Sequence, residues 1–216
     1  SFGIKDNTLA PTPGNYMAPW PRTDRGTAQD GLGTFDLSRW NSDYFERLKR
    51  FVRTAGKHGV IVELVLFCTF YEDILWEVNP MNPANNVNEL GRVHRDSVYT
   101  LGNDQLVTYQ EQFVEKVVTE LNAFDNLYFE IANEPYFGSF TDAWTDRMVR
   151  TIVETEENLP QQHLIAQNIA NNSAEIDAPH PQTSIFNFHY AEPAAVSQNY
   201  HLNKVIGDDE TGFDGT

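Results

Sequence analysis

The sequence has little cysteine and little positive charge. Cys68 is its single cysteine, so an intrachain disulfide cannot form and the redox compartment cannot be read from the sequence. The chain has 15 Lys and Arg against 31 Asp and Glu, and its formal net charge is −16. Binding nucleic-acid phosphates requires a basic face, which this balance hardly allows. We therefore expect no nucleic-acid partner, while neutral sugars, which are bound by aromatic rings and hydrogen bonds, stay open.

Several motifs with defined chemistry are also missing. The sequence contains no Gly-rich phosphate loop, no CxxC pair, no HExxH helix and no Gly-x-Ser-x-Gly elbow. It contains no apolar run of membrane-spanning length, no signal peptide and no lipidation motif. We expect no cofactor, no metal and no membrane partner, and the localisation, secreted or cytoplasmic, is left undetermined.

The chain does have enough apolar residues for one sizeable core. It has 216 residues, of which 40% are hydrophobic and 12% aromatic. A chain of this length and composition is typical of one globular domain. We predict a single domain over residues 1–216.

Helical and strand patterns alternate along the chain. Hydrophobic spacing predicts helices over 43–58, 105–122 and 140–158, and strands over 60–67, 127–132, 164–168, 185–189 and 205–209. Asp43 and Glu46 have the form of a capping box, and Gly59 closes the first helix. Residues 1–35 and 68–103 are predicted as loops, the second an aromatic wall of the site. This alternation indicates a parallel α/β architecture.

The strand over 127–132 runs directly into Asn133-Glu134-Pro135. Pro135 has no N–H and biases Glu134 toward an extended conformation, so we expect the strand to end there. Glu134 would then project from the carboxyl end of its strand, the edge at which α/β sheets and barrels bind ligands. Glu130 shares a face with Glu134 but lies deeper, which predicts a buried structural role.

A second strand, over 205–209, also ends in a glutamate, Glu210. A retaining glycosidase needs two carboxyl groups about 5 to 5.5 Å apart, one as acid/base and one as nucleophile. The order and strand context of Glu134 and Glu210 fit this requirement. The run Asp208-Asp209-Glu210 also allows a cluster of oxygen ligands for a metal or a solvated turn, although no matching ligand spacing surrounds it.

The strand followed by Asn133-Glu134-Pro135 resembles the fourth-strand motif of the retaining glycoside hydrolases with (β/α)8 barrels, typified by the family-five cellulases. Runs such as Phe-Asp-Leu-Ser-Arg-Trp and Pro-Met-Asn-Pro-Ala-Asn-Asn-Val-Asn are similar to a bacterial branch of that family. The resemblance implies that Glu134 is the acid/base, Glu210 the nucleophile, and Asn133 a ligand of the sugar 2-hydroxyl. His189 and Tyr190 resemble the residues that support the nucleophile.

The resemblance also implies a fold. The predicted strands correspond to the third to seventh of the barrel, and the first, second and eighth have no candidates. We therefore expect an α/β fold of the TIM (β/α)8 type that is incomplete. Its open edges, around 60–67 and 205–209, predict that a second copy of the chain or the N-terminal loop covers them.

Further residues are candidates for binding a carbohydrate substrate. Trp20 either forms a sugar platform or pins its loop to the core, and Trp76 lies in the aromatic wall. Asn168 and Asn171 are candidate hydrogen-bond donors to sugar. The function expected is retaining hydrolysis of β-glycosidic bonds in a β-glucan or related oligosaccharide. The alternative is a non-catalytic, carbohydrate-binding remnant of such a barrel.

Overall fold

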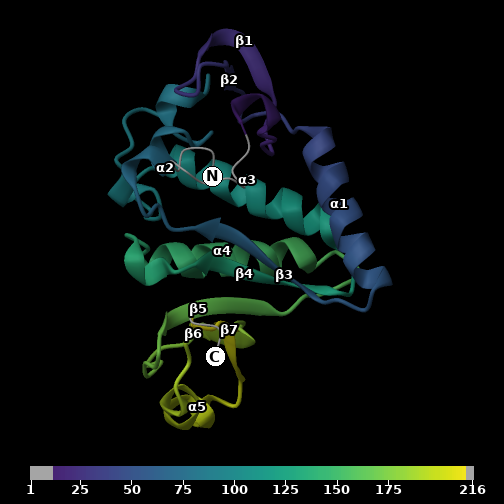
Figure 1. Cartoon of the computed structure of the whole chain (residues 1–216), viewed down its shortest axis with the longest axis vertical. Helices are drawn as coiled ribbons and strands as arrows, with labels where there is room; N and C mark the ends of the chain where they lie inside the picture. The colour runs from purple at the N-terminus through teal and green to yellow at the C-terminus, as the bar shows by residue number, and fades with distance from the viewer. Residues whose placement is uncertain (1–11, 213–216) are drawn as a thin grey trace.

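The computed structural model describes residues 12–212, and its centre is a five-stranded parallel sheet in the order β3-β4-β5-β6-β7. The sheet order is the chain order, since each strand pairs with the next one in sequence (Figure 1). The strands are β3 (Val62–Cys68), β4 (Leu127–Asn133), β5 (Ile165–Asn171), β6 (Ile185–His189) and β7 (Val205–Glu210). The predicted α/β class with strands at these places is confirmed.

Helices connect most of these strands. They are α1 (Ser42–Lys57), α2 (Asp73–Glu77), α3 (Asp104–Leu121), α4 (Asp142–Glu156) and α5 (Pro193–Asn199). Five short 3-10 helices are η1 (Pro13–Asn15), η2 (Pro83–Asn85), η3 (Arg95–Ser97), η4 (Pro135–Phe137) and η5 (Tyr200–Leu202). The three long helices were all predicted. The predicted loop over 68–103 instead holds α2, η2 and η3.

Helix α1 begins differently from the prediction. Asn41 is its N-cap, and the Asn41 side chain accepts a hydrogen bond of 3.2 Å from the backbone N–H of Asp43. Asp43 therefore lies inside the first turn, where its negative charge interacts favourably with the helix dipole and stabilises the helix. Gly59 follows the helix with φ +70°, as expected of a residue that ends a helix.

The predicted loop over residues 1–35 contains an antiparallel hairpin, so that prediction was wrong for its described part; residues 1–11 lie outside the described residues. Strands β1 (Arg22–Thr27) and β2 (Gly33–Phe35) pair with each other. Arg22 forms an ion pair with Asp30 and donates a 2.8 Å hydrogen bond to the carbonyl of Gly33. The hairpin lies at the opposite end of the molecule from α5 (Figure 1).

The main hydrophobic core lies between the first two strands of the sheet and the long helices. Phe67 of β3 contacts Phe113 of α3 and Trp144 of α4, with ring centroids 5.8 and 5.0 Å away. Trp144 is completely buried, and its indole N–H donates a 2.8 Å hydrogen bond to Gln110. This core fixes β3 and β4, the strands that lead into the predicted site.

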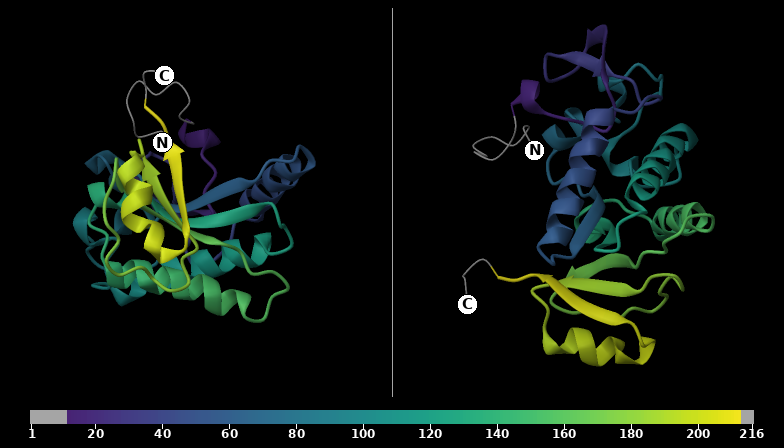
Figure 2. Two further views of the ribbon diagram at one scale, coloured as in Figure 1. Left: turned by 90° about the horizontal axis from the view of Figure 1, so that it is seen from below. Right: turned by 90° about the vertical axis from the view of Figure 1, so that its right-hand side faces the viewer.

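A smaller core lies at the other end of the sheet. Phe186 and Phe188 of β6 pack there with Ala195 of α5 and with Ile176 of the connection between β5 and β6. Helix α5 lies beside β7 in both views of Figure 2. The connection from β5 to β6 has no helix among its residues.

The sheet has two open edges in the described part of the chain. No strand there pairs with the outer side of β3 or of β7, so the described residues show five parallel strands and not a closed barrel. Val60 and Ile61, predicted in a buried strand, precede β3 and are exposed, Ile61 to 70%. Within residues 12–212, no helix is both long enough and apolar enough to cross a membrane.

Candidate active site

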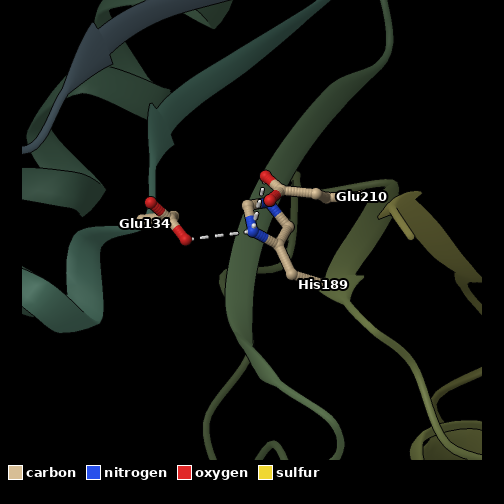
Figure 3. A group of neighbouring side chains, drawn as sticks. All are labelled: Glu134, His189 and Glu210. Atoms are coloured by element: carbon tan, nitrogen blue, oxygen red, sulfur yellow. Dashed lines mark hydrogen bonds and ion pairs between the residues drawn. The ribbon is translucent and has the colours of Figure 1, made fainter. Parts of the chain in front are cut away.

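The carboxyl edge of the sheet gathers three of the predicted site residues. Glu134 follows β4 directly, His189 is the last residue of β6, and Glu210 is the last residue of β7. Parallel strands end at the same edge, so residues from distant parts of the chain meet there. Figure 3 shows both glutamate carboxylates next to the His189 ring, with dashed lines from the ring to each of them.

His189 contacts both carboxylates through one ring nitrogen. Its Nδ1 lies 3.2 Å from Oε1 of Glu134 and 3.3 Å from Oε2 of Glu210. One oxygen of each glutamate and one nitrogen of the histidine all lie within 4.8 Å of one another. The other ring nitrogen, Nε2, lies 3.5 Å from Oδ1 of Asp209, and the His189 side chain is 2% exposed. The histidine is thus held in place by three carboxylates.

The backbone of Glu134 is left-handed, with φ 48° and ψ 51°. The expectation of an extended Glu134 was therefore wrong. The rule that a residue before proline avoids the right-handed helical region still holds, but a tertiary contact selects which of the other regions is used. The backbone N–H of Glu134 donates a 3.2 Å hydrogen bond to Oδ1 of Asn168 on β5. Asn168, predicted to bind sugar, thus uses its amide oxygen to hold Glu134.

Tyr71 is a site residue that the sequence interpretation did not single out as a candidate. Its hydroxyl donates a hydrogen bond to Oε2 of Glu134 and accepts one of 3.1 Å from Nδ2 of Asn133. Burial, and next the bond to Glu134, raise the pKa of Tyr71, so the hydroxyl stays protonated as a donor. The one signal for it in the sequence was the aromatic content of residues 68–103.

Tyr190 performs the corresponding contact for the other glutamate. Its hydroxyl donates a hydrogen bond to Oε1 of Glu210, and that bond, followed by burial, raises the pKa of Tyr190 to about 12. The backbone N–H of Tyr190 also donates to the carbonyl of Glu210 at 2.6 Å. Tyr190 therefore fixes both the side chain and the backbone of Glu210.

A second acidic group lies below this edge, formed by Glu63, Glu130 and Asp209. Asn187 donates through Nδ2 to Oε1 of Glu63 at 2.6 Å and to Oε2 of Glu130 at 3.0 Å. Burial is the main cause that raises the pKa of Glu130 to about 8 and that of Asp209 to about 6. Glu130 is fully buried, as predicted for a structural residue. It retains its proton near neutral pH.

Two groups of described residues have donor atoms close enough together to hold a metal ion. The glutamate, histidine and glutamate of the sheet edge form one, and Glu63, Glu130 and Asp209 form the other, each with donor atoms within 4.8 Å. Oxygen donors of this kind suit hard cations. In the first group the same geometry also meets the needs of two-carboxylate hydrolysis, for which no cation is required.

The two predicted tryptophans lie in the lining of one cavity. Trp20 and Trp76 are each 5% exposed and line this cavity of about 500 Å³, together with Tyr71. Trp20 stacks on Trp40 with ring centroids 6.1 Å apart, which is the contact expected of a residue that pins its loop to the core. The cavity adjoins the glutamate edge through Tyr71.

A known structure shares this fold. A protein of Bacteroides vulgatus, named only provisionally as a glycoside hydrolase, superposes with a TM-score of 0.64 and 16% identity over 94% of this chain. The chain spans 35% of that protein's length. Endo-glycoceramidase II of a Rhodococcus species, in complex with a cellobiose-like isofagomine, superposes with a TM-score of 0.45 and 13% identity, over 77% of this chain and 50% of the other. At these identities, the first likeness describes the fold. No curated protein matches the sequence.

The sequence does match one family of proteins. Residues 7–169 fit the family described as "Domain of unknown function (DUF6298)". The matched region includes Glu134 and Asn168, whereas His189 and Glu210 lie beyond it. Since the match covers most of the 216 residues, the chain belongs to the DUF6298 family.

Proposed function

We propose that the protein hydrolyses β-glycosidic bonds with retention of configuration, with Glu134 as the acid/base and Glu210 as the nucleophile. The observation that carries the proposal is the pair of carboxylates that both contact His189, with one oxygen of each within 4.8 Å of the other. Both come from the carboxyl ends of parallel strands, where enzymes of this architecture place their catalytic groups. The substrate we propose is a β-glucan or a related oligosaccharide.

The separation of the carboxylates favours retention over inversion. Retaining glycosidases hold their carboxyl groups about 5 to 5.5 Å apart, whereas inverting ones leave about 6.5 to 9.5 Å for a water molecule. One oxygen of Glu134 lies within 4.8 Å of one oxygen of Glu210. This separation is nearer to the retaining range than to the inverting range, so direct attack by Glu210 fits better.

In the proposed reaction, the protonated Glu134 gives its proton to the glycosidic oxygen while a Glu210 oxygen attacks the anomeric carbon. The bond to the leaving group breaks and a glycosyl ester of Glu210 forms. Glu134 then takes a proton from water, the water oxygen attacks the anomeric carbon, and Glu210 is released. Asn133 binds the 2-hydroxyl of the sugar in this proposal.

Three neighbours keep the two glutamates in position. Tyr71 donates to Glu134, Tyr190 donates to Glu210, and His189 contacts both. Each glutamate has two oxygens, and in each the tyrosine and the histidine occupy different ones. Such fixed orientation supports catalysis because a reacting oxygen must be aimed at the anomeric carbon before the reaction starts.

Proton NMR of the first-formed product tests the stereochemistry. The purified protein is screened on aryl β-glycosides and soluble β-glucans, and the anomer released from an active substrate is recorded before mutarotation. We expect the β anomer. An α anomer as the first product would overturn the assignment of Glu210 as nucleophile.

Variants test the two roles separately. We expect Glu134→Gln and Glu210→Gln each to lose at least about 1,000-fold in kcat, since each removes a group that acts in the transition state. With azide as an external nucleophile, Glu210→Ala should yield an α-glycosyl azide and Glu134→Ala a β-glycosyl azide. Glu192→Gln, an exposed glutamate next to the same edge, is the matched control and should keep wild-type activity.

A non-catalytic carbohydrate-binding protein is the second candidate. It is favoured by the open sheet, because β7, the strand that carries Glu210, is paired on one side alone in the described residues. A misplacement of about 1 Å can cost about 100-fold in rate. If the wild type hydrolyses none of the glycosides tried, yet binds oligosaccharides with the same affinity as both Gln variants, this second function replaces the first.

A further inference from the structure

A cavity lies between β3, the segment that follows it and the N-terminal part of the chain. It has a volume of about 500 Å³, within the range of about 300 to 1,000 Å³ typical of small-molecule sites. No charged side chain is present among its described lining residues. Its walls are mainly aromatic and aliphatic, with Trp20, Phe70, Tyr71, Leu75, Trp76 and Tyr99 among them. We call it the aromatic cavity.

Two polar atoms belong to its lining residues and have no hydrogen-bond partner among the residues described. They are the indole N–H of Trp20 and the hydroxyl of Thr69, which are 5% and 2% exposed as residues. Buried polar groups in native proteins are nearly always paired. An apolar cavity with a few unpaired polar atoms is the arrangement that binding sites for small organic groups show.

The aromatic cavity adjoins one of the two glutamates in particular. Tyr71 lines the cavity, and the same side chain donates its hydroxyl to Oε2 of Glu134. Glu210 is held instead by Tyr190, which is not among the lining residues. In the proposed reaction, Glu134 protonates the oxygen of the leaving group. In that reaction, the leaving group therefore lies next to Glu134, on the side of the site where the cavity is.

From this geometry we propose that the aromatic cavity binds the leaving group, and that the substrate is a β-glycoside with an apolar alkyl or aryl aglycone. The inference rests on the proposed function, which assigns the leaving group to the Glu134 side. It narrows the substrate proposed there from a β-glucan to a saccharide that is linked to an apolar aglycone. A further sugar would bring several hydroxyl groups to a surface with few hydrogen-bond partners for them. An alkyl chain or an aromatic ring has no such groups, so it loses no hydrogen bonds to water when it is buried there. The indole N–H of Trp20 and the Thr69 hydroxyl are available to a polar atom on the aglycone.

The test compares glycosides that share a sugar and differ in the aglycone. Methyl and n-octyl β-D-glucopyranoside, the latter below its critical micelle concentration, are titrated into Glu134→Gln protein by calorimetry. We expect the octyl glycoside to bind at least about 10-fold more tightly, because its additional methylenes enter the apolar cavity. Equal affinities for the two would overturn the proposal.

Variants locate the binding. Leu75 lines the cavity, so Leu75→Trp fills part of it and Leu75→Ala enlarges it at the same position. In the Glu134→Gln background, we expect Leu75→Trp to weaken octyl binding at least about 10-fold and leave methyl binding unchanged, with Leu75→Ala retaining octyl binding. The control is Phe137→Ala, an exposed aromatic residue close to Glu134 that does not line the cavity. Octyl binding that Leu75→Trp does not weaken would overturn the location.

The outcomes separate this inference from the proposed function. In one outcome, the wild type hydrolyses no glycoside while Leu75→Trp still abolishes octyl glucoside binding. That pair of results would support the cavity as an apolar binding site and overturn the proposed glycosidase activity. Hydrolysis with a kcat/KM that does not depend on the length of the aglycone would keep the enzyme and overturn the cavity's role. A 6-O-octanoyl glucoside that binds as tightly as the octyl glucoside would overturn the leaving-group side.

Discussion

Asn168 accepts a 3.2 Å hydrogen bond from the backbone N–H of Glu134, and Glu134 has left-handed backbone angles. A glutamate is seldom left-handed, because its Cβ then approaches the following carbonyl oxygen. Asn168 lies on the neighbouring strand β5 and is buried. One amide oxygen therefore helps hold the proposed acid/base in a conformation it would not adopt unaided.

Replacing Asn168 by Ala should lower kcat while leaving KM almost unchanged. The variant removes the acceptor for the Glu134 N–H, so the carboxyl group loses its fixed aim; we expect a fall of about 10- to 100-fold in kcat. Gln167→Ala, at the adjacent position, is the control. A rise in KM with unchanged kcat would instead assign Asn168 to sugar binding.

Glu130→Gln should change how stability depends on pH. Burial raises the pKa of Glu130 from 4.5 to about 8, so the folded chain binds a proton that the unfolded chain releases above 4.5. The stabilisation is full below pH 4.5 and is lost as the pH rises toward 8. Gln carries no proton to lose, so we expect the variant to be more stable than the wild type at pH 9, by about 1 to 3 kcal/mol.

Urea unfolding at a series of pH values between 4 and 9 measures this dependence. The pKa of Asp209, raised to about 6 mainly by burial, gives the wild type a further decline of the same sign between pH 4 and 6. Asp209→Asn should remove that lower part and, because the Asp209 charge also raises the pKa of Glu130, shift the remaining decline to lower pH. Parallel curves for the wild type and Glu130→Gln would contradict the assignment of a proton to Glu130.

His163→Gln should destabilise the fold far from the candidate site. His163 contacts Glu156 through Nδ1 at 2.5 Å and the carbonyl of Phe124 through Nε2 at 2.7 Å, and both ionisable side chains are buried. Burial lowers the pKa of His163, but these hydrogen bonds outweigh it and raise the pKa above 6.5. Removing one member of a buried ion pair costs on the order of 3 kcal/mol.

A double-mutant cycle with Glu156→Gln isolates the pair. The contribution of the protonated histidine should be complete below pH 6.5 and be lost as the pH rises through the raised pKa of the folded state. Unfolding free energies at pH 6 and pH 9 should thus give a larger coupling at pH 6. A coupling that is equal at both would mean that His163 is not charged in the fold.

Val205→Lys should reduce association between copies of the chain. Val205 begins the edge strand β7 and is 55% exposed, and we predict that open edges of this sheet are covered by a second copy. A lysine on an edge strand discourages such pairing. Sedimentation should show a concentration-dependent oligomer for the wild type and a monomer for the variant, with Val196→Lys on α5 as control. A wild type that stays monomeric at all concentrations would contradict the prediction that a second copy covers this edge.

Strands β3 to β7 and the long helices were predictable because each has a strong local pattern. The run from Ile185 to His189 has apolar residues at three of its five positions, is buried throughout and matches β6 at both ends. Hairpin β1–β2 was missed because its first strand, Arg22–Thr27, is polar throughout and largely exposed, so it shows no alternation. Its stability comes instead from contacts such as Arg22 with Asp30, which only the folded chain reveals.

In the site, the strand-terminal residues Glu134, His189 and Glu210 could be predicted because they follow recognisable strands. Tyr71 could not, since its contact with Glu134 spans 63 positions in sequence and arises from an irregular segment. The left-handed Glu134 was missed for the same reason, because the deciding partner, Asn168, comes from another strand.

The agreement between sheet order and chain order also has a consequence for the timing of folding during synthesis. Each strand from β4 to β7 can add to a strand that has already emerged, so the sheet can grow in one direction as the chain is made. Glu134 leaves the ribosome before Glu210, and the two meet only after β7 has docked. The nascent protein thus acquires its core, between β3, β4 and the long helices, well before it acquires any capacity for the proposed chemistry.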